Sequence, residues 1–557
     1  MRILTTSQLV RSRFAISCAL GLVALTLAAP TWADGTNIAS DVYVSSSVTP
    51  YVLDVDLRNV PRAAEWQPGD PIKVVDEGAY ADYAVEPDPD WQDPIRQRGA
   101  TEPAFSTPLG VNFGGIGFGG GTPPDVVGAV GPEHYIQMVN ASRFQIWDKT
   151  GAVLVGETDL SDLWTGSATS PCADGDGDPI VQYDQLADRW MMSEFDLSGN
   201  TFCYYISQTP DPVSGGWFVY DFSSPRFPDY PQYGVWPDAY YVGTFESPTL
   251  GIYAFDRTSM LAGAPATFQR FTIPALNGTA PRVTRILPAD VDGPAPPDGS
   301  PNYFARTVDD TQDSSDPTDR IEIWEFIVDF GTPANSSFTQ VSTLIPSPFT
   351  LLPCSPGIRD CVPQPGTANQ IDALFNRPLR RLQYRNFGSY ETMLFNQVVD
   401  AGGVGGKRWF ELRKSGAGPW SIYQEGTYSP DSVYRFMGSV AMNGAGHIAL
   451  GYSVSDGDSV IPGIRATARR NGEALGLMTM EELVIEAGTG IQTNSQRWGD
   501  YSSMNIDPVD DRTFWYTNQM VDANGFWTTH VGSFTIDGLF FKGFESGTTD
   551  EWSTTVQ

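Results

Sequence analysis

Residues 178–222 read DPIVQYDQLADRWMMSEFDLSGNTFCYYISQTPDPVSGGWFVYDF, and the fold is assigned from this stretch. It contains four short apolar runs, which are PIVQYD, RWMMSEF, FCYYISQ and GWFVYDF. The breaks between them are rich in Asp, Ser, Asn, Pro and Gly, residues that favour turns. Both faces of each run are apolar or aromatic, which is typical of strands covered on both sides. The stretch therefore predicts a four-stranded unit packed between neighbours.

Six further segments have a comparable build, and they span residues 126–157, 233–273, 286–345, 382–426, 435–470 and 499–536. Short strands in units of about 45 residues are the signature of a propeller, in which neighbouring units bury one another's faces. Sandwich domains in series would need a linker rich in Pro, Gly or Ser, and none occurs between Asp125 and Ile536. We expect an all-β fold with a single β-propeller of about seven four-stranded blades, with six or eight as alternatives. The stretch TMEELVIEAG (479–488) is the one candidate for a short helix.

The two ends of the chain lie outside the predicted propeller, which spans residues 122–537. Three arginines precede the apolar run FAISCALGLVALTLAA, and small residues follow at 31–33. This order predicts a secretory signal peptide over 1–33, and hence an extracellular or periplasmic protein. Residues 34–121 are expected to form an extended leader that adds a strand or lies across the propeller, and Gly114–Gly121 to form a flexible entry. Residues 538–557 form a C-terminal tail, and no second apolar run is long enough to span a membrane.

The chain is strongly acidic, with 66 Asp and Glu against 34 Lys and Arg and a formal net charge of −32. This charge repels phosphate backbones and anionic membranes, so nucleic acid is excluded as a partner. Beyond the signal peptide there are four cysteines, an even count that indicates two disulfides in an exported chain. Of the three pairings, we expect the two local ones, Cys172–Cys203 and Cys354–Cys361. We expect a monomer.

Several phrases along the chain are similar to a family of uncharacterised, propeller-like exoproteins secreted by bacteria. They include PPDVVGAVGPEHYIQMVN (123–140), GDPIVQYDQLADRW (177–190) and RWGDYSSMNIDPVDDRTFWYTN (497–518). The resemblance covers roughly residues 105–536. It implies a secreted bacterial protein with a β fold, and it implies no catalytic residue. The tail GLFFKGFESGTTDEWS (538–553) resembles a short ending of many exported bacterial proteins, and a disordered end is the alternative.

An acidic run precedes the first strand of the 178–222 unit. Asp174, Asp176 and Asp178 alternate with glycines, a spacing that can wrap carboxylate oxygens around Ca²⁺. The run departs from the helix-flanked calcium loop, so the alternative is an acidic turn. The three histidines, at 134, 447 and 530, have neither a zinc spacing nor a serine partner, and we expect them in the core or on the surface.

A second group of candidates appears when the predicted units are laid over one another. The first strand of each propeller blade lines the central channel, so residues at its start should ring one mouth. The candidates are Asp125, Asp178, Asp238, Asp290, Arg385, Arg435 and Asp500, with Tyr233, Trp236, Trp498 and Tyr501 nearby. Polar groups between aromatic walls are what a carbohydrate site uses. The alternative is that each Asp caps a tight turn and each Arg pairs with one.

The sequence therefore predicts a secreted propeller that binds an extracellular ligand, a carbohydrate above all, at the channel mouth. One alternative is a secreted glycoside hydrolase or polysaccharide lyase that uses a carboxylate pair at the same mouth. Another is a structural or adhesive surface protein that acts through its outer faces. Calcium is the one cofactor that the sequence suggests, and no reaction can be assigned.

Overall fold

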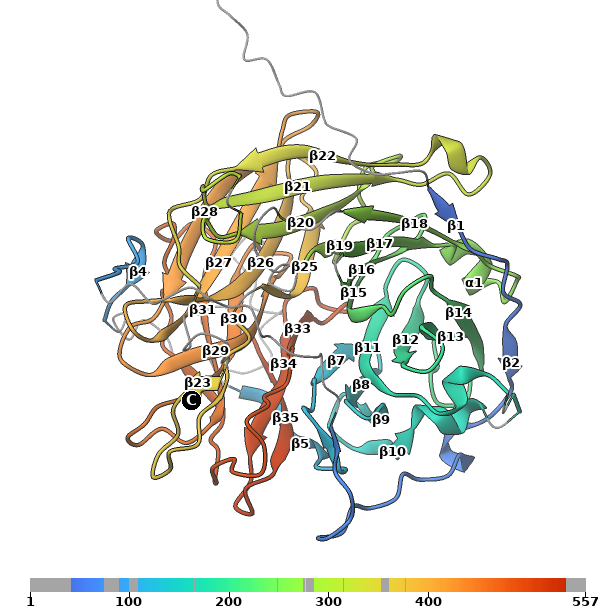
Figure 1. Cartoon of the computed structure of the whole chain (residues 1–557), viewed down its shortest axis with the longest axis horizontal. Coiled ribbons are helices and arrows are strands. Elements are labelled where there is room, and N and C mark those ends of the chain that lie inside the picture. Colours follow the sequence, from blue (N-terminus) through green and yellow to red (C-terminus); the bar gives the residue numbers. More distant parts are fainter. Residues whose placement is uncertain are drawn as a thin grey trace, which may run out of the picture.

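The computed structural model describes residues 42–74, 90–99 and 109–536, apart from 165, 168, 248, 274–275, 277–284, 314, 352–359 and 376. Within these residues, seven antiparallel blades stand around a common axis (Figure 1). The predicted all-β propeller is confirmed, and the number of blades is seven. The predicted signal peptide and the C-terminal tail lie outside the described residues.

The first four blades follow the chain from the inner strand outward. Blade 1 consists of β7 (Val127–Val130), β8 (His134–Val139), β9 (Arg143–Asp148) and β10 (Val153–Asp159). Blade 2 consists of β11 (Gly177–Asp184), β12 (Arg189–Asp196), β13 (Thr201–Ser207) and β14 (Trp217–Ser223). Blade 3 consists of β15 (Asp229–Val235), β16 (Tyr240–Glu246), β17 (Thr249–Phe255) and β18 (Phe268–Ile273). Blade 4 consists of β19 (Leu287–Val291), β20 (Asn302–Val308), β21 (Arg320–Ile327) and β22 (Ser337–Leu344).

The remaining blades repeat this plan until the last one, which takes its outer strand from the N-terminal side of the chain. Blade 5 consists of β25 (Pro378–Asn386), β26 (Glu391–Asp400), β27 (Gly405–Lys414) and β28 (Ser421–Tyr428). Blade 6 consists of β29 (Tyr434–Met442), β30 (Ile448–Ser455), β31 (Gly463–Arg469) and β32 (Leu483–Glu486). Blade 7 consists of β33 (Ser503–Ile506), β34 (Phe514–Val521), β35 (Trp527–Phe534) and β5 (Leu109–Gly117).

Short elements lie in the loops. They are β3 (Lys73–Val74), β6 (Gly121–Thr122), β23 (Asp360–Val362), β24 (Ile371–Asp372), α1 (Arg257–Leu261), η1 (Leu57–Asn59), η2 (Leu160–Trp164), η3 (Pro171–Ala173) and η5 (Pro333–Asn335). None of the helices in the described part of the chain has the length and apolarity needed to cross a membrane.

Side chains, more than backbone, join neighbouring inner strands around the axis. Among the described residues, β19 and β25 are the one pair of inner strands joined by a ladder, which is parallel. At the other blade boundaries an amide or carboxylate side chain bonds to the backbone of the next blade. These bonds join Asn140 to Asp178 N (3.2 Å), Gln182 to Tyr233 O (3.2 Å), Asp290 to Val235 N (3.0 Å), Gln383 to Met442 N (2.6 Å), Asn518 to Met437 O (3.0 Å) and Asn505 to Gly128 O (2.7 Å). They satisfy backbone groups that burial would otherwise leave unpaired.

The ring is closed by β5, which corrects the prediction of a flexible glycine entry. Its residues pair antiparallel with β35. Gln137 of blade 1 accepts a hydrogen bond from Ile116 N (2.7 Å) and donates one to Thr517 of blade 7 (2.6 Å). The glycines serve close packing here, because a Cβ on Gly115 would overlap the side chains of Gln137 and Thr529. The sequence predicted a flexible segment here because glycine in the interior of a strand weakens that strand.

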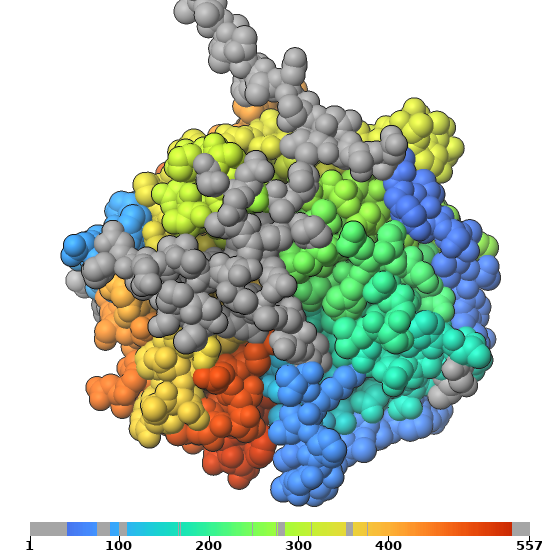
Figure 2. All heavy atoms as spheres, viewed as in Figure 1, coloured from blue at the N-terminus to red at the C-terminus, as the bar shows by residue number. Residues whose placement is uncertain are grey.

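Three short strands of the described leader lie along the outer rim and add to the outer strands of blades, one of the two arrangements predicted for the leader. β1 (Tyr43–Val44) pairs with β18, β2 (Tyr51–Leu53) with β14, and β4 (Arg96–Gln97) with β28. Figure 1 shows the first two on the outer edges of blades 3 and 2, and Figure 2 shows the same blue segment on the rim of the molecule. This arm covers strand edges that would otherwise be open to pairing with other chains.

Two further predictions can be compared with the described residues. The stretch TMEELVIEAG does not form a helix, because Leu483–Glu486 supply the outer strand that blade 6 would otherwise lack. The Cys172–Cys203 disulfide is confirmed, with a Cα–Cα distance of 5.7 Å. Cys361 is disulfide-bonded, and Cys354 lies outside the described residues, so that pair stays a prediction.

We expect the substitution Gly115→Ala to lower the free energy of unfolding by about 1–3 kcal/mol, because the added methyl must displace Gln137 from the closing strand. Gly114→Ala is the matched control, since a Cβ at Gly114 meets nothing within 4 Å and should change stability by less than about 0.5 kcal/mol. Chemical denaturation of both variants measures the difference. Equal effects at the two glycines would contradict this account of the closure.

Candidate functional site

The structure does not bring the predicted mouth residues to one mouth. Asp125, Asp178 and Asp500 precede or begin inner strands, whereas Asp238 follows the end of β15 and Arg385 stands near the end of β25. Inner strands of a propeller run in the same direction, so their starts and ends lie at opposite mouths. The superposition of the units made from the sequence therefore combined residues at the starts of some inner strands with residues at the ends of others. The alternation of apolar and polar residues along a strand does not show where the strand begins or ends.

Four of the candidates do gather at the starting ends of the inner strands. Asp125 accepts hydrogen bonds from Asp500 N (2.6 Å) and from the Asn140 amide (2.7 Å). Tyr501 donates its hydroxyl proton to Pro179 O (3.0 Å). Burial raises the pKa of Tyr501, and the carboxylates of Asp178, Asp125 and Asp500 raise it further. These contacts join blades 7, 1 and 2, a structural role that neither the ligand-site prediction nor its turn-cap alternative included.

The other candidates are each held by neighbouring residues. Asp290 contacts Arg381 (2.6 Å), Arg385 contacts Asp511 (2.6 Å), Arg435 contacts Asp431 and Glu482 (both 2.7 Å), Tyr241 donates to Asp238 (3.2 Å), Trp236 donates to Ser300 O (3.0 Å) and Trp498 donates to Ser453 (3.1 Å). Tyr233 is buried, and its backbone oxygen accepts from Gln182. These side chains hold the fold together.

A small cavity lies between the inner strands around the channel axis. Its volume is about 20 Å³, enough for one water-sized particle. A sugar residue does not fit in this cavity.

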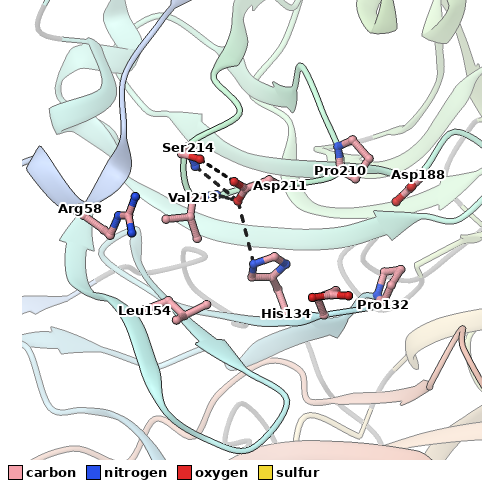
Figure 3. Close-up of a pocket in the computed structure, with 10 residues that line it drawn as sticks. Arg58, Pro132, His134, Leu154, Asp188, Pro210, Asp211, Val213 and Ser214 are labelled. Atoms are coloured by element: carbon pink, nitrogen blue, oxygen red, sulfur yellow. Dashed lines mark hydrogen bonds and ion pairs between the residues drawn. The ribbon is translucent and has the colours of Figure 1, made fainter.

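A much larger space lies between blades 1 and 2 and measures about 590 Å³. It is formed by the β7–β8, β11–β12 and β13–β14 turns, the start of β10, and η1 of the N-terminal arm. Its lining residues are Arg58, Pro132, Glu133, His134, Leu154, Asp188, Pro210, Asp211, Val213 and Ser214. We call this space the blade 1–2 cleft. Figure 3 shows Arg58 and Asp188 towards its two ends, with His134 and Asp211 facing each other between them.

Asp211 is held by the turn in which it stands. It accepts hydrogen bonds from Val213 N (2.8 Å) and from the Ser214 hydroxyl (2.6 Å). Burial by itself raises the pKa of Asp211, but the hydrogen bonds from Ser214 and Val213 outweigh it and leave the pKa below its usual value. The carboxylate therefore stays ionised and keeps a fixed position. The flanking prolines and Gly216 (φ +77°) set the backbone of the turn.

His134 stands opposite, at the first position of β8, with Nε2 4.0 Å from Asp211. Burial lowers the pKa of His134, and the nearby Asp211 offsets this only in part. The imidazole is therefore neutral at pH 7, and its two nitrogens offer one donor and one acceptor. The other histidines contact strands elsewhere, His447 at Asn471 N (3.0 Å) and His530 at Asn112 (2.8 Å).

Sequence reasoning missed the blade 1–2 cleft because its residues were assigned as turn residues. GPEH (131–134) and TPDPVSGG (209–216) are both hairpin turns, and they lie about 80 residues apart. A weak signal was present, since both turns place an acidic residue directly after a proline. Only the packing of blade 1 against blade 2 brings them together.

The acidic run at 174–178 does not converge on a common point. Asp176 forms an ion pair with Lys73 of β3 (3.0 Å) and accepts from Leu197 N (2.8 Å). Among the described residues, three carboxylates with oxygens within 4.8 Å of one another occur at Asp309, Asp310 and Asp319. Calcium binding at 174–178 therefore stays a prediction, and it would require Lys73 to move.

Beneath this run lies a buried acid, Glu194 of β12. It accepts a hydrogen bond from Tyr205 (2.6 Å), which in turn accepts one from Trp164 (2.8 Å). Burial raises the pKa of Glu194 to about 7, because the hydrogen bonds from Ser142 and Tyr205 offset it only in part. The folded protein thus keeps a proton that the unfolded chain releases near pH 4.5.

We expect Glu194 to make the protein less stable as the pH rises from about 4.5 through about 7, because the unfolded chain binds fewer protons in this window. Glu194→Gln keeps the Tyr205 hydrogen bond and has no proton to lose. The melting temperature of the variant relative to the native protein should therefore rise between pH 5 and pH 8, by an amount equivalent to about 3 kcal/mol. Glu481→Gln, at an exposed position, is the control. A difference that does not vary with pH would rule out this titration.

Comparisons with known proteins identify no family for this chain. No family model and no curated protein matches the chain, so the resemblance to bacterial exoproteins stays a prediction. Solved structures that match include Drosophila Plexin A in complex with Semaphorin 1b, at 8% identity over 79% of this chain and 88% of that chain, with a TM-score of 0.38. An endo-arabinase from Bacteroides thetaiotaomicron matches at 14% identity over 52% of this chain and 92% of that chain, with a TM-score of 0.24. A protein of unknown function from Dyadobacter fermentans matches at 10% identity over 80% of this chain and 97% of that chain, with a TM-score of 0.31. Such values carry no argument about function.

Proposed function

We propose that this protein binds a neutral extracellular carbohydrate in the blade 1–2 cleft. The observation that supports this most is the cleft itself, which measures about 590 Å³ and mixes carboxylate, guanidinium, imidazole and hydroxyl groups with apolar side chains. Small-molecule sites have volumes of about 300–1,000 Å³. The predicted secretory signal supports an extracellular ligand. The proposal moves the site from the channel mouth to the turns between two blades.

The polar groups suit a ligand with many hydroxyls, each of which can donate and accept. Glu133, Asp188 and Asp211 offer acceptors, Arg58 offers donors, and the Ser214 oxygen, whose proton goes to Asp211, offers a further acceptor. Leu154 and the prolines offer apolar contact for the C–H face of a sugar ring. Because the turn already holds Asp211 in place, binding costs little further ordering of this side chain.

Charge selects against acidic sugars. Three carboxylates face one guanidinium in the cleft, and Arg58 is itself paired with Asp56 at 2.6 Å. The chain as a whole carries a formal net charge of −32. A uronic acid would meet repulsion both on approach and in the cleft. The lowered pKa of Asp211 suits a hydrogen-bond acceptor and not a general acid, which needs a raised pKa.

We expect Asp211→Asn to weaken binding of a neutral oligosaccharide by roughly 5- to 150-fold, the equivalent of about 1–3 kcal/mol for a mispaired polar contact. Asparagine keeps an Oδ1 that accepts from Val213 N, and its Nδ2 can donate to the Ser214 oxygen, so the turn should survive. A glycan array with neutral and acidic oligosaccharides identifies the ligand, and calorimetry then measures the dissociation constant.

The matched control is Asp510→Asn. Asp510 makes the same turn contacts, to Arg512 N (2.8 Å), Thr513 N (3.0 Å) and the Thr513 hydroxyl (2.6 Å), but it does not line the cleft. It should leave binding unchanged. Equal losses in the two variants, or an array with no neutral glycan bound, would refute the proposal. Cleavage products detected by mass spectrometry would favour a hydrolase or lyase instead.

A further inference from the structure

The small cavity inside the channel has a lining unlike the rest of the core. It lies between the inner strands of blades 1, 2, 4, 5 and 7, and its volume is about 20 Å³. Its polar lining residues are Gln182, Tyr183, Gln185, Asp290, Asp292, Arg380, Arg381 and Asn505. Two of these are consecutive arginines on β25, and both are buried.

Arg381 donates hydrogen bonds to both carboxylates that line this cavity, those of Asp290 and Asp292. Its Nη1 donates to Asp290 (2.6 Å) and to Asp292 (3.3 Å), and its Nη2 also donates to Asp292. The free sides of these acids are occupied too, since Val235 N donates to Asp290 (3.0 Å) and Gln383 donates to Asp292 (2.5 Å). Among the described residues, Arg380 donates no hydrogen bond to either carboxylate.

Arg380 is left with little compensation for its charge. It is 2% exposed, and its one hydrogen bond to a described residue runs from Nη2 to Val181 O at 3.4 Å. Its Nε and Nη1, and the Nε of Arg381, have no acceptor among the described residues. Burial lowers the pKa of Arg380 to about 10, and attraction to Asp290 offsets this only in part. The two arginines and two aspartates together carry no net charge, so the unfavourable feature is the set of buried donors without acceptors.

We infer that the channel cavity binds one small monatomic anion, such as chloride, against Arg380. Among the residues that line the cavity, three guanidinium nitrogens are unpaired, against one unpaired acceptor, Gln182 Oε1, so the cavity favours an acceptor over a cation. A volume of about 20 Å³ admits one particle of about the size of a water molecule and excludes sulfate or phosphate. Water could accept from two of these donors and would leave the third unpaired. A halide can accept hydrogen bonds from all three.

The anion links blades that share few backbone bonds. It would sit between β25 of blade 5 and the inner strands facing it across the axis, where Gln182 of blade 2 and Asn505 of blade 7 also line the cavity. Binding to the folded state alone stabilises that state by an amount that grows with the logarithm of halide concentration above the dissociation constant. We therefore expect halide to stabilise the whole ring.

Thermal unfolding of the mature chain tests this inference. Sodium chloride or bromide is compared with sodium gluconate at equal ionic strength. We expect halide to raise the melting temperature by roughly 2–4 °C, with a rise that follows the logarithm of halide concentration. Arg380→Gln should abolish the difference between the salts. Arg385→Gln is the matched control on the same strand, because Arg385 is already paired with Asp511, and its halide response should persist.

Bromide-soaked crystals of the native protein give a second measurement that does not depend on a variant folding. An anomalous peak within about 3.5 Å of Arg380 Nε or Nη1 would support the inference. A water molecule without anomalous signal at that place would overturn it. An equal halide response in Arg380→Gln would overturn it as well.

Discussion

The pairing of β5 with β35 is the constraint on which the propeller depends. Residues 109–117 complete blade 7, so the first and last parts of the ring lie in one sheet. A blade cannot bury both of its faces alone, and an open ring would expose the faces of blades 1 and 7. Gln137 contacts β5 and blade 7 together, which couples closure to the packing of blade 1. The arm that precedes β5 then covers the outer edges of blades 3, 2 and 5.

Closure places seven inner strands around a narrow axis. In this arrangement the buried backbone groups of the inner strands need hydrogen-bond partners other than a neighbouring strand. Inner strands diverge too much to form ladders with one another, apart from β19 and β25 in the described chain. Their buried N–H and C=O groups still need partners, and Asn, Gln and Asp side chains supply them. Asp125 and Asp290 therefore look like a ligand-binding ring in the sequence while they act as links between blades. Arg380 is the exception, and its unpaired nitrogens are the reason to place an anion beside it.

The turns at the ends of the strands do not have to supply partners for the buried backbone groups of the inner strands. They lie at the surface, and loops supported by a rigid scaffold are where binding groups concentrate. In the blade 1–2 cleft, three hairpin turns and η1 of the arm supply charges of both signs around one open space. Asp211 and Asp510 show the same turn chemistry at two blades, but only Asp211 borders a cleft. Asp211 and Asp510 have the same local motif, so it is their position in the ring that makes Asp211 line the blade 1–2 cleft while Asp510 caps a turn elsewhere.

The sequence by itself determined the all-β class, the repeat and the local disulfide Cys172–Cys203, because each depends on residues close in the chain. Strand periodicity and turn residues act over a few positions, so seven units could be recognised without their neighbours. The tertiary structure alone decided which end of each inner strand meets which mouth, and that glycines 114, 115 and 117 form a strand. It also decided that Leu483–Glu486 complete a blade, since the unpaired edge of β31 outweighs helix propensity. The blade 1–2 cleft belongs to the same group, because His134 and Asp211 come together only when two blades pack.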